Sequence, residues 1–342
     1  MSSKVASTQA KSHEDIINLA KRFVPPLSSK LHKGQAGRIG VVGGSQDYTG
    51  APFFSSMSSM RIGADLAHVI CEPKAGSVIK TYSPDLIVHT VLDPANPPTE
   101  EVLSGIISRL HALVIGPGLG RDDDMQKFGK MCLEVAKKMK KWVVLDADGL
   151  YMVTNEPDLV KGYEKAILSP NKMEFSRLCE KLNIKSDADP KTLCPDLASA
   201  LGNVTVIQKG ATDIISNGRP IEFLDSSVEN NKILENNTKG GLKRCGGQGD
   251  VLSGTVGCMA AWAGMWAEGD YNDVTPTPPG KKESFAPLAL LATYAAASVT
   301  RQASRTGFSK HGRSMQTSDI IQNVGPSFEI IMGSDDKGES ED

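Results

Sequence analysis

Short continuous runs of Val, Ile and Leu recur between residues 38 and 210, and longer segments with helical patterning separate them. Continuous apolar runs are typical of strands that are buried on both faces, as in a parallel sheet. We therefore expect strands at RIGVVGG from residue 38, LAHVIC from 66, LIVHTV from 86, HALVIGPG from 111, KWVVLDADG from 141, KAILSP from 165 and NVTVIQKG from 203.

The segments between these runs predict helices, of which 122–140 (DDDMQKFGKMCLEVAKKMK) is one example. Its three leading aspartates and closing lysines suit the helix macrodipole. Strand and helix alternate, which indicates an α/β fold with right-handed crossovers. Two long helices of small residues are expected at 249–267 and 284–304, and they are compatible with a monomer or a homo-oligomer.

The pattern changes after residue 212. The segment DIISNGRPIEFL at 213–224 predicts an antiparallel hairpin that turns at Asn217 and Gly218. The stretch DYNDVTPTPPGKKES at 270–284 predicts a surface loop, and the final SDDKGESED predicts a disordered acidic tail.

Composition narrows the class of partner. Charged residues make up 23% of the 342-residue chain and the formal net charge is -2, so charge favours neither nucleic acid nor an anionic membrane. No apolar run reaches the about 20 residues that span a bilayer. The first residues lack an apolar signal-peptide core and carry Glu14 and Asp15, so we expect a cytoplasmic protein and leave a mitochondrial location open.

The six cysteines form no C-x-x-C pair, and the six histidines show no zinc-binding spacing. We therefore expect reduced, buried thiols and no transition-metal site.

The segment KRCGGQGDVLSG at 243–254 is the strongest candidate for chemistry. Gly246, Gly247 and Gly249 precede a helix, and successive glycine N–H groups at a helix N-terminus can hold an anion. No Gly-Lys-Ser/Thr occurs, so the segment is not a Walker loop. Asp250 has two interpretations, a group that deprotonates or orients a hydroxyl attacking phosphorus, or a plain helix N-cap.

Three further segments lie after expected strands, where ligands of open α/β sheets bind. Lys209 follows the strand from 203 and is either a phosphate ligand or a solvated turn lysine. Asn171 and Glu174 have the spacing of a capping box, and their alternative role is to hold waters of Mg²⁺. The 116–121 segment GPGLGR fails the G-x-G-x-x-G spacing of a dinucleotide fingerprint and is instead expected to line a substrate.

Two other strand ends complete the expected site. Asp146 and Asp148, in VLDADGL, point into the same region, and we expect one of them to be only a turn residue. The loop at 43–52 joins the first strand to a helix of small residues and is a candidate lid over the substrate.

Taken in order, these motifs resemble the ribokinase-like superfamily, whose anion hole is a Gly-x-Gly-Asp turn. Within it, VVGGSQDYTGAP, IGPGLGR, VLDADGL, LSPNKMEF, QKGATD and KRCGGQGDVLSG together resemble the ATP-dependent NAD(P)H-hydrate dehydratases, which are carbohydrate-kinase-domain repair enzymes. The resemblance covers roughly residues 33 to 325. One departure is Gln248, which stands where the wider superfamily prefers alanine.

The resemblance implies a three-layer α/β/α fold with a mostly parallel sheet and a short hairpin. It implies an N-terminal extension at 1–25, partly helical, a single catalytic domain at 26–332 and an acidic tail at 333–342. The implied activity is repair of the S epimer of hydrated NADH or NADPH, in which ATP phosphorylates the C6 hydroxyl and loss of phosphate regenerates the dinucleotide. An epimerase of the hydrates is the implied pathway partner.

The resemblance also implies roles for individual residues. Asp250 would be the base or orienting group, Gly246, Gly247 and Gly249 the anion hole, and Asn171 and Glu174 the support for Mg²⁺. ATP would contact Lys209, Gly210, Ala211, Thr212, Asp213, Gly240, Gly241, Leu242, Lys243, Arg244, Cys245, Gly246, Gly247, Gln248 and Gly249. The hydrated dinucleotide would contact Ala51, Gly118, Asn171, Lys172, Met173, Glu174, Phe175, Ser176, Arg177 and Asp250.

Two alternatives stay open at this point. One is a small-molecule kinase of the same fold that acts on a vitamin precursor or sugar and releases a stable phosphoester. The other is a nucleotide-binding protein without catalysis, which the intact Asp250 and its glycines argue against.

Overall fold

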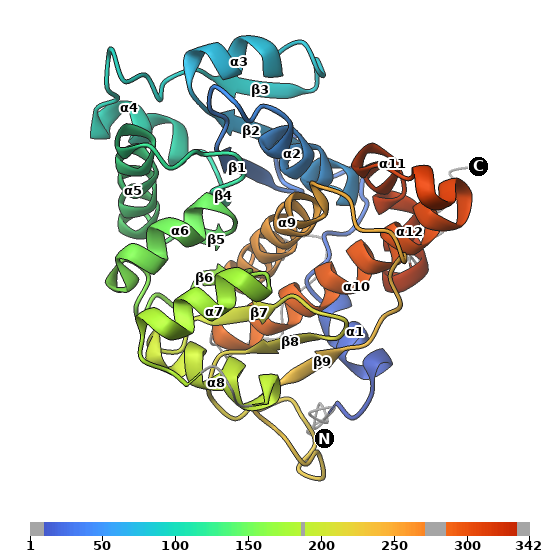
Figure 1. Cartoon of the computed structure of the whole chain (residues 1–342). Coiled ribbons are helices and arrows are strands. Elements are labelled where there is room, and N and C mark those ends of the chain that lie inside the picture. Colours follow the sequence, from blue (N-terminus) through green and yellow to red (C-terminus); the bar gives the residue numbers. More distant parts are fainter. Residues whose placement is uncertain (1–9, 186–188, 271–284, 334–342) are drawn as a thin grey trace, which may run out of the picture.

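A nine-stranded sheet forms the centre of the computed structural model, which describes residues 10–185, 189–270 and 285–333 (Figure 1). The strand order is β3-β2-β1-β4-β5-β6-β7-β8-β9. The first seven strands pair in parallel, and β8 and β9 add antiparallel. All seven expected strands are confirmed. They are β1 (Arg38–Val42), β2 (Leu66–Ile70), β3 (Leu86–His89), β4 (Ala112–Ile115), β5 (Trp142–Leu145), β6 (Ala166–Leu168) and β7 (Thr205–Gln208), followed by β8 (Asp213–Ser216) and β9 (Leu234–Asn236).

Helices cover both faces of the sheet, which confirms the three-layer α/β/α fold. Along β4, Ala112 and Val114 join the apolar core on one face while Leu113 and Ile115 join the core on the other, as the two-residue period of a strand requires. One core contains α1 (His13–Lys21), α2 (Gly50–Ile62), α3 (Pro73–Ile79), α9 (Gln248–Glu268), α10 (Phe285–His311), α11 (Thr317–Gln322) and α12 (Val324–Met332). The other contains α4 (Glu100–Ile107), α5 (Asp123–Lys138), α6 (Asp148–Asn155), α7 (Lys172–Lys181) and α8 (Pro190–Ala200).

The small-residue helices predicted from the sequence pack against one another inside the chain. Helix α9 lies between α2 and α10 (Figure 1). A Cβ on Gly254 of α9 would sit 2.0 Å from the carbonyl oxygen of Ser55 in α2, so glycine is needed for this close approach. The small side chains are therefore explained by helix packing within one protomer.

The expected helices are confirmed, with one change in length. Asp122 caps α5 by accepting from the Met125 N–H, at 3.0 Å, and two aspartates and two lysines occupy its first and last turns. Helix α10 ends seven residues later than the expected 304, at His311. The glycine within this extension, Gly307, lies against Met315 and Asp319, so tertiary packing carries the helix past a residue that usually favours its end.

The prediction that 213–216 forms a hairpin with the residues up to 224 is wrong, because β8 pairs with other strands. The chain does turn after β8, with Gly218 at φ +78°, but residues 219–224 form no strand. Instead, β8 pairs with β7 on one side and with β9 on the other. The tight hairpin is therefore the connection between β7 and β8, and Lys209 is in its loop.

The N-terminal helix is built into the core. Ile17, Ala20 and Phe23 are buried in the same apolar core as α10, and His13 Nδ1 lies 2.8 Å from the hydroxyl of Tyr294. The loop expected at 270–284 and the acidic tail fall almost entirely outside the described residues, and the domain boundaries stay predictions. In the described part of the chain, no helix combines the length and the apolar character needed to cross a bilayer.

Candidate functional site

Three neighbouring parallel strands deliver polar side chains to one edge of the sheet, and a fourth is followed by a glycine. Asp146 follows β5, Ser169 follows β6 and Lys209 follows β7, while Gly116 follows β4. A cavity of about 380 Å³ opens at this edge. It is lined by Asn171, Lys209, Gly210, Asp213, Gly240, Arg244, Gln248, Gly249, Leu252, Ala297, Thr300, Arg301, Ser304 and Ile320.

Eight of these lining residues were predicted from the sequence. A larger cavity of about 1040 Å³ lies beside β9 and contains none of the predicted site residues. We assign the site to the smaller cavity because it is the one at the carboxyl ends of the parallel strands, beside the glycine cluster.

Asp250 is the third residue of α9 and does not cap the helix. The N-cap is Gly247, at φ +97°, and no side chain caps this end. The interpretation of Asp250 as a plain N-cap is therefore wrong, because Gly247 is the N-cap and Asp250 lies in the first turn of the helix. Within the described residues the half-buried carboxyl of Asp250 accepts no hydrogen bond, so the carboxyl is available to a ligand.

The uncapped start of α9 leaves its first N–H groups available to an anion. Gly247 packs so closely that a Cβ there would lie 2.7 Å from Phe54 and 2.9 Å from Thr317. A Cβ on Gly249 would lie 3.4 Å from Lys209 Nζ, so an ammonium group stands directly beside the turn. Gly246, by contrast, has nothing within 4 Å of such a Cβ.

Lys209 is not a solvated turn lysine. Its Nζ lies 2.8 Å from Asp146 Oδ1, an oxygen that also accepts from Ser169 Oγ at 2.9 Å, and its side chain is 20% exposed. Burial alone would lower the pKa of Lys209, but the carboxylates of Asp146 and Glu174 raise it above its ordinary value. A fixed positive charge therefore faces the glycine turn.

The carboxyl of Asp250 is electrostatically coupled to this group. Burial and the negative charge of Asp146 raise the pKa of Asp250 to about 8, while Lys209 opposes the shift. A carboxyl with such a pKa can take up a proton near neutral pH, which is the property of a general base.

The capping box predicted at 171–174 is confirmed. Asn171 Oδ1 accepts from the N–H groups of Met173 and Glu174, at 2.9 and 3.0 Å, and Glu174 Oε2 accepts from the Asn171 N–H at 2.8 Å. Burial raises the pKa of the Glu174 carboxyl, which lies near Lys209. Asn171 Oδ1 and Glu174 Oε2, two oxygens that could ligate a metal here, are therefore both used in the helix cap.

No three His, Cys, Asp or Glu side chains are arranged as a metal site within the residues that the structure describes. Mg²⁺ keeps several of its waters and is usually bound by one or two carboxylates together with substrate phosphates. Glu174 Oε1 stays outside the helix cap and could hold such an ion through a water molecule. Asn171 Oδ1 already accepts two hydrogen bonds, which argues against direct ligation by Asn171.

The loop after β4 packs against the segment at 43–52. The carbonyl of Gly118 accepts from Gly44 N and Ser45 Oγ, at 2.9 and 3.0 Å, and a Cβ there would meet Tyr48 at 2.8 Å. Pro52, the residue after Ala51, lies beside Gly118, so the segment that contains Ala51 adjoins the loop that contains Gly118. Asp148 accepts from Gly120 N and Arg121 Nε, which makes Asp148 the member of the aspartate pair that holds the loop.

The predicted contact residues differ in burial and in the partners of their side chains. Phe175 is only 3% exposed and belongs to the apolar core, so its side chain does not face the cavity. Met173 and Leu242 are exposed on the surface. Both carboxylate oxygens of Asp213 are hydrogen-bonded to Arg301, which leaves this carboxylate committed within the protein.

Gln248, the departure from the superfamily pattern, has a structural role. Its Nε2 donates to the carbonyl of Lys243 at 3.0 Å and lies 3.4 Å from Cys245 Sγ. This side chain therefore ties the loop before α9 to the first residue of the helix.

Helix α10 supplies a wall of the cavity that was not predicted from the sequence. Ala297, Thr300, Arg301 and Ser304 all line the cavity from this helix. Arg301 is the first charged residue in a long run of small and apolar residues, and that is the one local signal that could have identified it.

Comparison with known proteins adds independent findings. The NAD(P)H-hydrate dehydratase family matches residues 39–325. The ATP-dependent (S)-NAD(P)H-hydrate dehydratase of Mycosarcoma maydis is 47% identical, over 97% of this chain and 93% of that protein. The human protein of the same name is 46% identical, over 93% of this chain and 85% of that protein.

Two solved structures share the fold. A ribokinase-like protein from Enterococcus faecalis is 20% identical, with a TM-score of 0.66 over 98% of this chain and all of that one. The ADP/ATP-dependent NAD(P)H-hydrate dehydratase of Bacillus subtilis, co-crystallized with ATP and Mg²⁺, is 18% identical, with a TM-score of 0.58 over 92% of this chain and 97% of that one. At these identities the likeness shows the ribokinase-like fold alone.

Proposed function

Because this chain belongs to the NAD(P)H-hydrate dehydratase family, we infer that it repairs hydrated NADH and NADPH at the expense of ATP. The observation that carries the chemistry is the position of Asp250. Its unpartnered carboxyl stands in the first turn of α9, beside the open N–H groups of the glycine turn and near Lys209.

The proposed reaction has two stages. Asp250 accepts the proton of the C6 hydroxyl as the hydroxyl oxygen attacks the terminal phosphorus of ATP, and ADP leaves with the electrons of the broken P–O bond. The C6–O bond then breaks, phosphate leaves with its electron pair, and a proton lost from C5 re-forms the ring double bond. The net products are the dinucleotide, ADP and phosphate, because phosphorylation has converted hydroxide into a better leaving group.

The surrounding residues supply binding and charge. The N–H groups of the turn at 247–249 would hold the transferring phosphoryl group through the start of α9. Lys209, held by Asp146, would place a positive charge beside it. Glu174 would hold Mg²⁺ through water, and Mg²⁺ would neutralise phosphate charge when bound.

We propose that the hydrated dinucleotide binds between the start of α7 and the place where Gly118 lies beside Pro52, the residue after Ala51. The wider biological setting is also a proposal. We place the protein in the cytoplasm, and we propose that an epimerase of the hydrates supplies the S epimer.

The test is to incubate the pure protein with ATP, Mg²⁺ and acid-hydrated NADH and to follow the absorbance of reduced nicotinamide together with released phosphate. We expect both to rise together. A stable phosphoester without recovery of absorbance would identify a small-molecule kinase instead.

The Asp250→Ala variant tests the assigned base. We expect turnover to fall by about 10²- to 10⁴-fold, the usual contribution of a positioned acid or base, while ATP binding persists. A variant that keeps more than about a tenth of the wild-type rate would remove Asp250 from the chemical step.

A further inference from the structure

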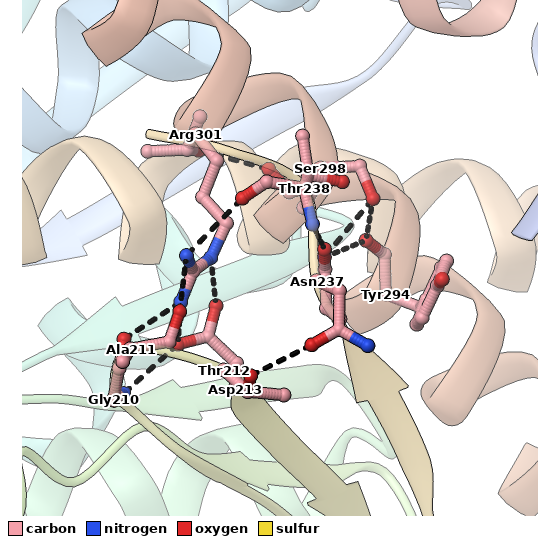
Figure 2. A network of polar contacts seen from close by, with 12 residues as sticks. Gly210, Ala211, Thr212, Asp213, Asn237, Thr238, Tyr294, Ser298 and Arg301 are labelled. Carbon is pink, nitrogen blue, oxygen red and sulfur yellow. Dashed lines mark hydrogen bonds and ion pairs between the residues drawn. The ribbon is translucent and has the colours of Figure 1, made fainter. Parts of the chain in front are cut away.

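Arg301 makes an unusually complete set of hydrogen bonds between α10 and the hairpin loop that follows β7. Nε donates to Asp213 Oδ2 at 2.6 Å, and NH2 donates to Asp213 Oδ1 and to the carbonyl of Gly210, both at 2.7 Å. NH1 donates to the carbonyls of Ala211 and Thr238, at 2.9 and 3.2 Å (Figure 2). A guanidinium has five N–H donors, so every donor of Arg301 is used.

These bonds join two loops that come from different parts of the chain. The loop at 209–212 connects β7 to β8, whereas Thr238 follows β9. A second bond between the same loops is the one from Thr212 Oγ1 to Asn237 Oδ1, at 2.7 Å (Figure 2). Both loops adjoin the cavity, because Gly210 and Gly240 line it.

The same helix anchors β9 one turn earlier. Asn236 Nδ2 donates to Ser298 Oγ at 3.0 Å and to the carbonyl of Tyr294 at 3.2 Å, and Asn236 Oδ1 accepts from Thr238 N at 3.0 Å. Helix α10 thus holds the strand and the two loops in a single network.

Arg301 is also largely removed from solvent. Its side chain is 14% exposed and that of Asp213 is 7% exposed. A charge pair in such a setting is stable only when its remaining donors and acceptors are satisfied, and this pair meets that condition. The arrangement requires a planar, forked cation, since lysine offers three donors from a single nitrogen.

We propose that Arg301 is a positioning residue for the nucleotide, which fixes the loops on the ATP side of the cavity without touching the reacting atoms. It has no N–H left for a phosphate unless one of these five bonds breaks. Its effect is instead on the backbone that immediately follows Lys209, the lysine that faces the glycine turn. This proposal rests on the proposed function, in that it takes ATP to be the occupant of this cavity.

The test compares Arg301→Lys with Arg305→Lys, a control one helical turn later. Arg305 is exposed, and no ion pair involves it among the described residues. With Arg301→Lys we expect the KM and Kd for ATP to rise about tenfold, since at least two charge-assisted hydrogen bonds are lost. The KM for the hydrate and the kcat should stay within about threefold, and Arg305→Lys should match the wild type.

A second variant keeps the proposal testable if Arg301→Lys does not fold. Asn237→Ala removes the exposed bond between the two loops, and we expect it to raise the Kd for ATP about threefold without lowering the melting temperature. A double-mutant cycle of Arg301→Lys with Asp213→Asn should be non-additive, because the two side chains contact each other directly.

The outcomes separate this proposal from the proposed function. Unchanged ATP affinity in both Arg301→Lys and Asn237→Ala would overturn the positioning role, as would equal rises in KM for both substrates. A wild-type protein that binds ATP but does not restore hydrated NADH would overturn the proposed function and leave the positioning role measurable by ATP binding. A wild-type protein that binds no ATP would overturn both.

Discussion

The residues around Asp250 shift the pKa of its carboxyl far from the ordinary value of an aspartate. Burial, together with the negative charges of Asp146, Asp148 and Glu174, raises the pKa of Asp250 to about 8, while Lys209 opposes the shift. In the free protein the carboxyl is therefore largely protonated at neutral pH. It becomes able to accept a proton as the pH rises through its folded-state pKa.

The raised pKa of Asp250 predicts how activity depends on pH. We expect kcat/KM for the hydrate to increase with pH and to level off above about 8, because this ratio reports the ionisation of the free enzyme. Asp146→Asn should move the midpoint to lower pH, since it removes a negative charge near Asp250 and releases Lys209 from its partner. The measurement is a pH series of initial rates at low hydrate concentration.

A matched control for that series is Glu101→Gln. Glu101 is exposed on α4 and is not among the charges that shift Asp250. Its profile should overlay that of the wild type. A wild-type profile that is flat between about pH 6 and 9, a range that contains the expected rise, would contradict a titrating Asp250 base.

Local spacing predicted some residue roles correctly. The capping box of Asn171 and Glu174 needs only a separation of three residues, and the structure contains it. The sequence around Lys209 does not distinguish a phosphate ligand from a solvated turn lysine, because its partner Asp146 is 63 residues away in the chain. Local patterns cannot reveal a partner at that distance.

At the scale of elements, the contact between α2 and α9 positions the site. Gly254 lies against the backbone of Ser55, and Ser55 Oγ lies 3.3 Å from Ser253 Oγ. Phe54 in the same part of α2 packs under Gly247. The separation of these two helices therefore sets where the glycine turn stands.

Gly254→Ala tests this packing. The added Cβ would lie 2.0 Å from the carbonyl oxygen of Ser55, so the helices must move apart. We expect the free energy of unfolding to fall by at least about 1–3 kcal/mol, the usual penalty for overpacking a core. Denaturant unfolding measures the change.

Gly105→Ala is the matched control for that substitution. Gly105 is an exposed residue in α4 with nothing within 4 Å of an added Cβ, so alanine should stabilise the helix by about 0.5–1 kcal/mol. If Gly254→Ala behaved like Gly105→Ala, the close contact between α2 and α9 would not limit stability.

The β7–β8 hairpin shows why a sequence pattern predicts a strand more readily than it predicts the strand's partners. The apolar segment at 213–216 was recognised as a strand, but its partners were not. Pairing depends on which strand edges the sheet leaves open, and β8 is bonded on both edges, to β7 and β9. The segment at 219–224 contains Pro220, which lacks the N–H that a ladder requires.

At the scale of the whole molecule, the chain is held together without disulfides. All six cysteines are free, and five of them are buried while Cys245 is half-buried. Burial raises the pKa of the Cys132 and Cys194 thiols to about 12, which keeps them protonated and unreactive.

Thiol labelling of the native, unreduced protein should therefore modify one cysteine rapidly and all six after unfolding. The rapid one should be Cys245, and ATP should slow its labelling because it lies in the loop proposed to line the nucleotide. A reductant should leave the melting temperature unchanged. Fewer than six reactive thiols in the unfolded, unreduced protein would reveal a disulfide.

The sequence by itself determined the fold class, the seven parallel strands and the family. Buried parallel strands need continuous apolar runs, and a phosphate-binding turn needs its glycines within a few residues, so both leave a local pattern. The same locality revealed Asp250, Lys209, Asn171 and Glu174 as candidates, although it left the role of each open.

Only the tertiary structure decided how these groups act together. It brought Asp146 to Lys209, excluded Asp250 as a helix cap, turned Phe175 into the core and placed Arg301 beside the nucleotide loops. These outcomes depend on burial and on contacts between residues far apart in the chain. Such contacts are created by the packing of sheet and helices, and no local spacing encodes them.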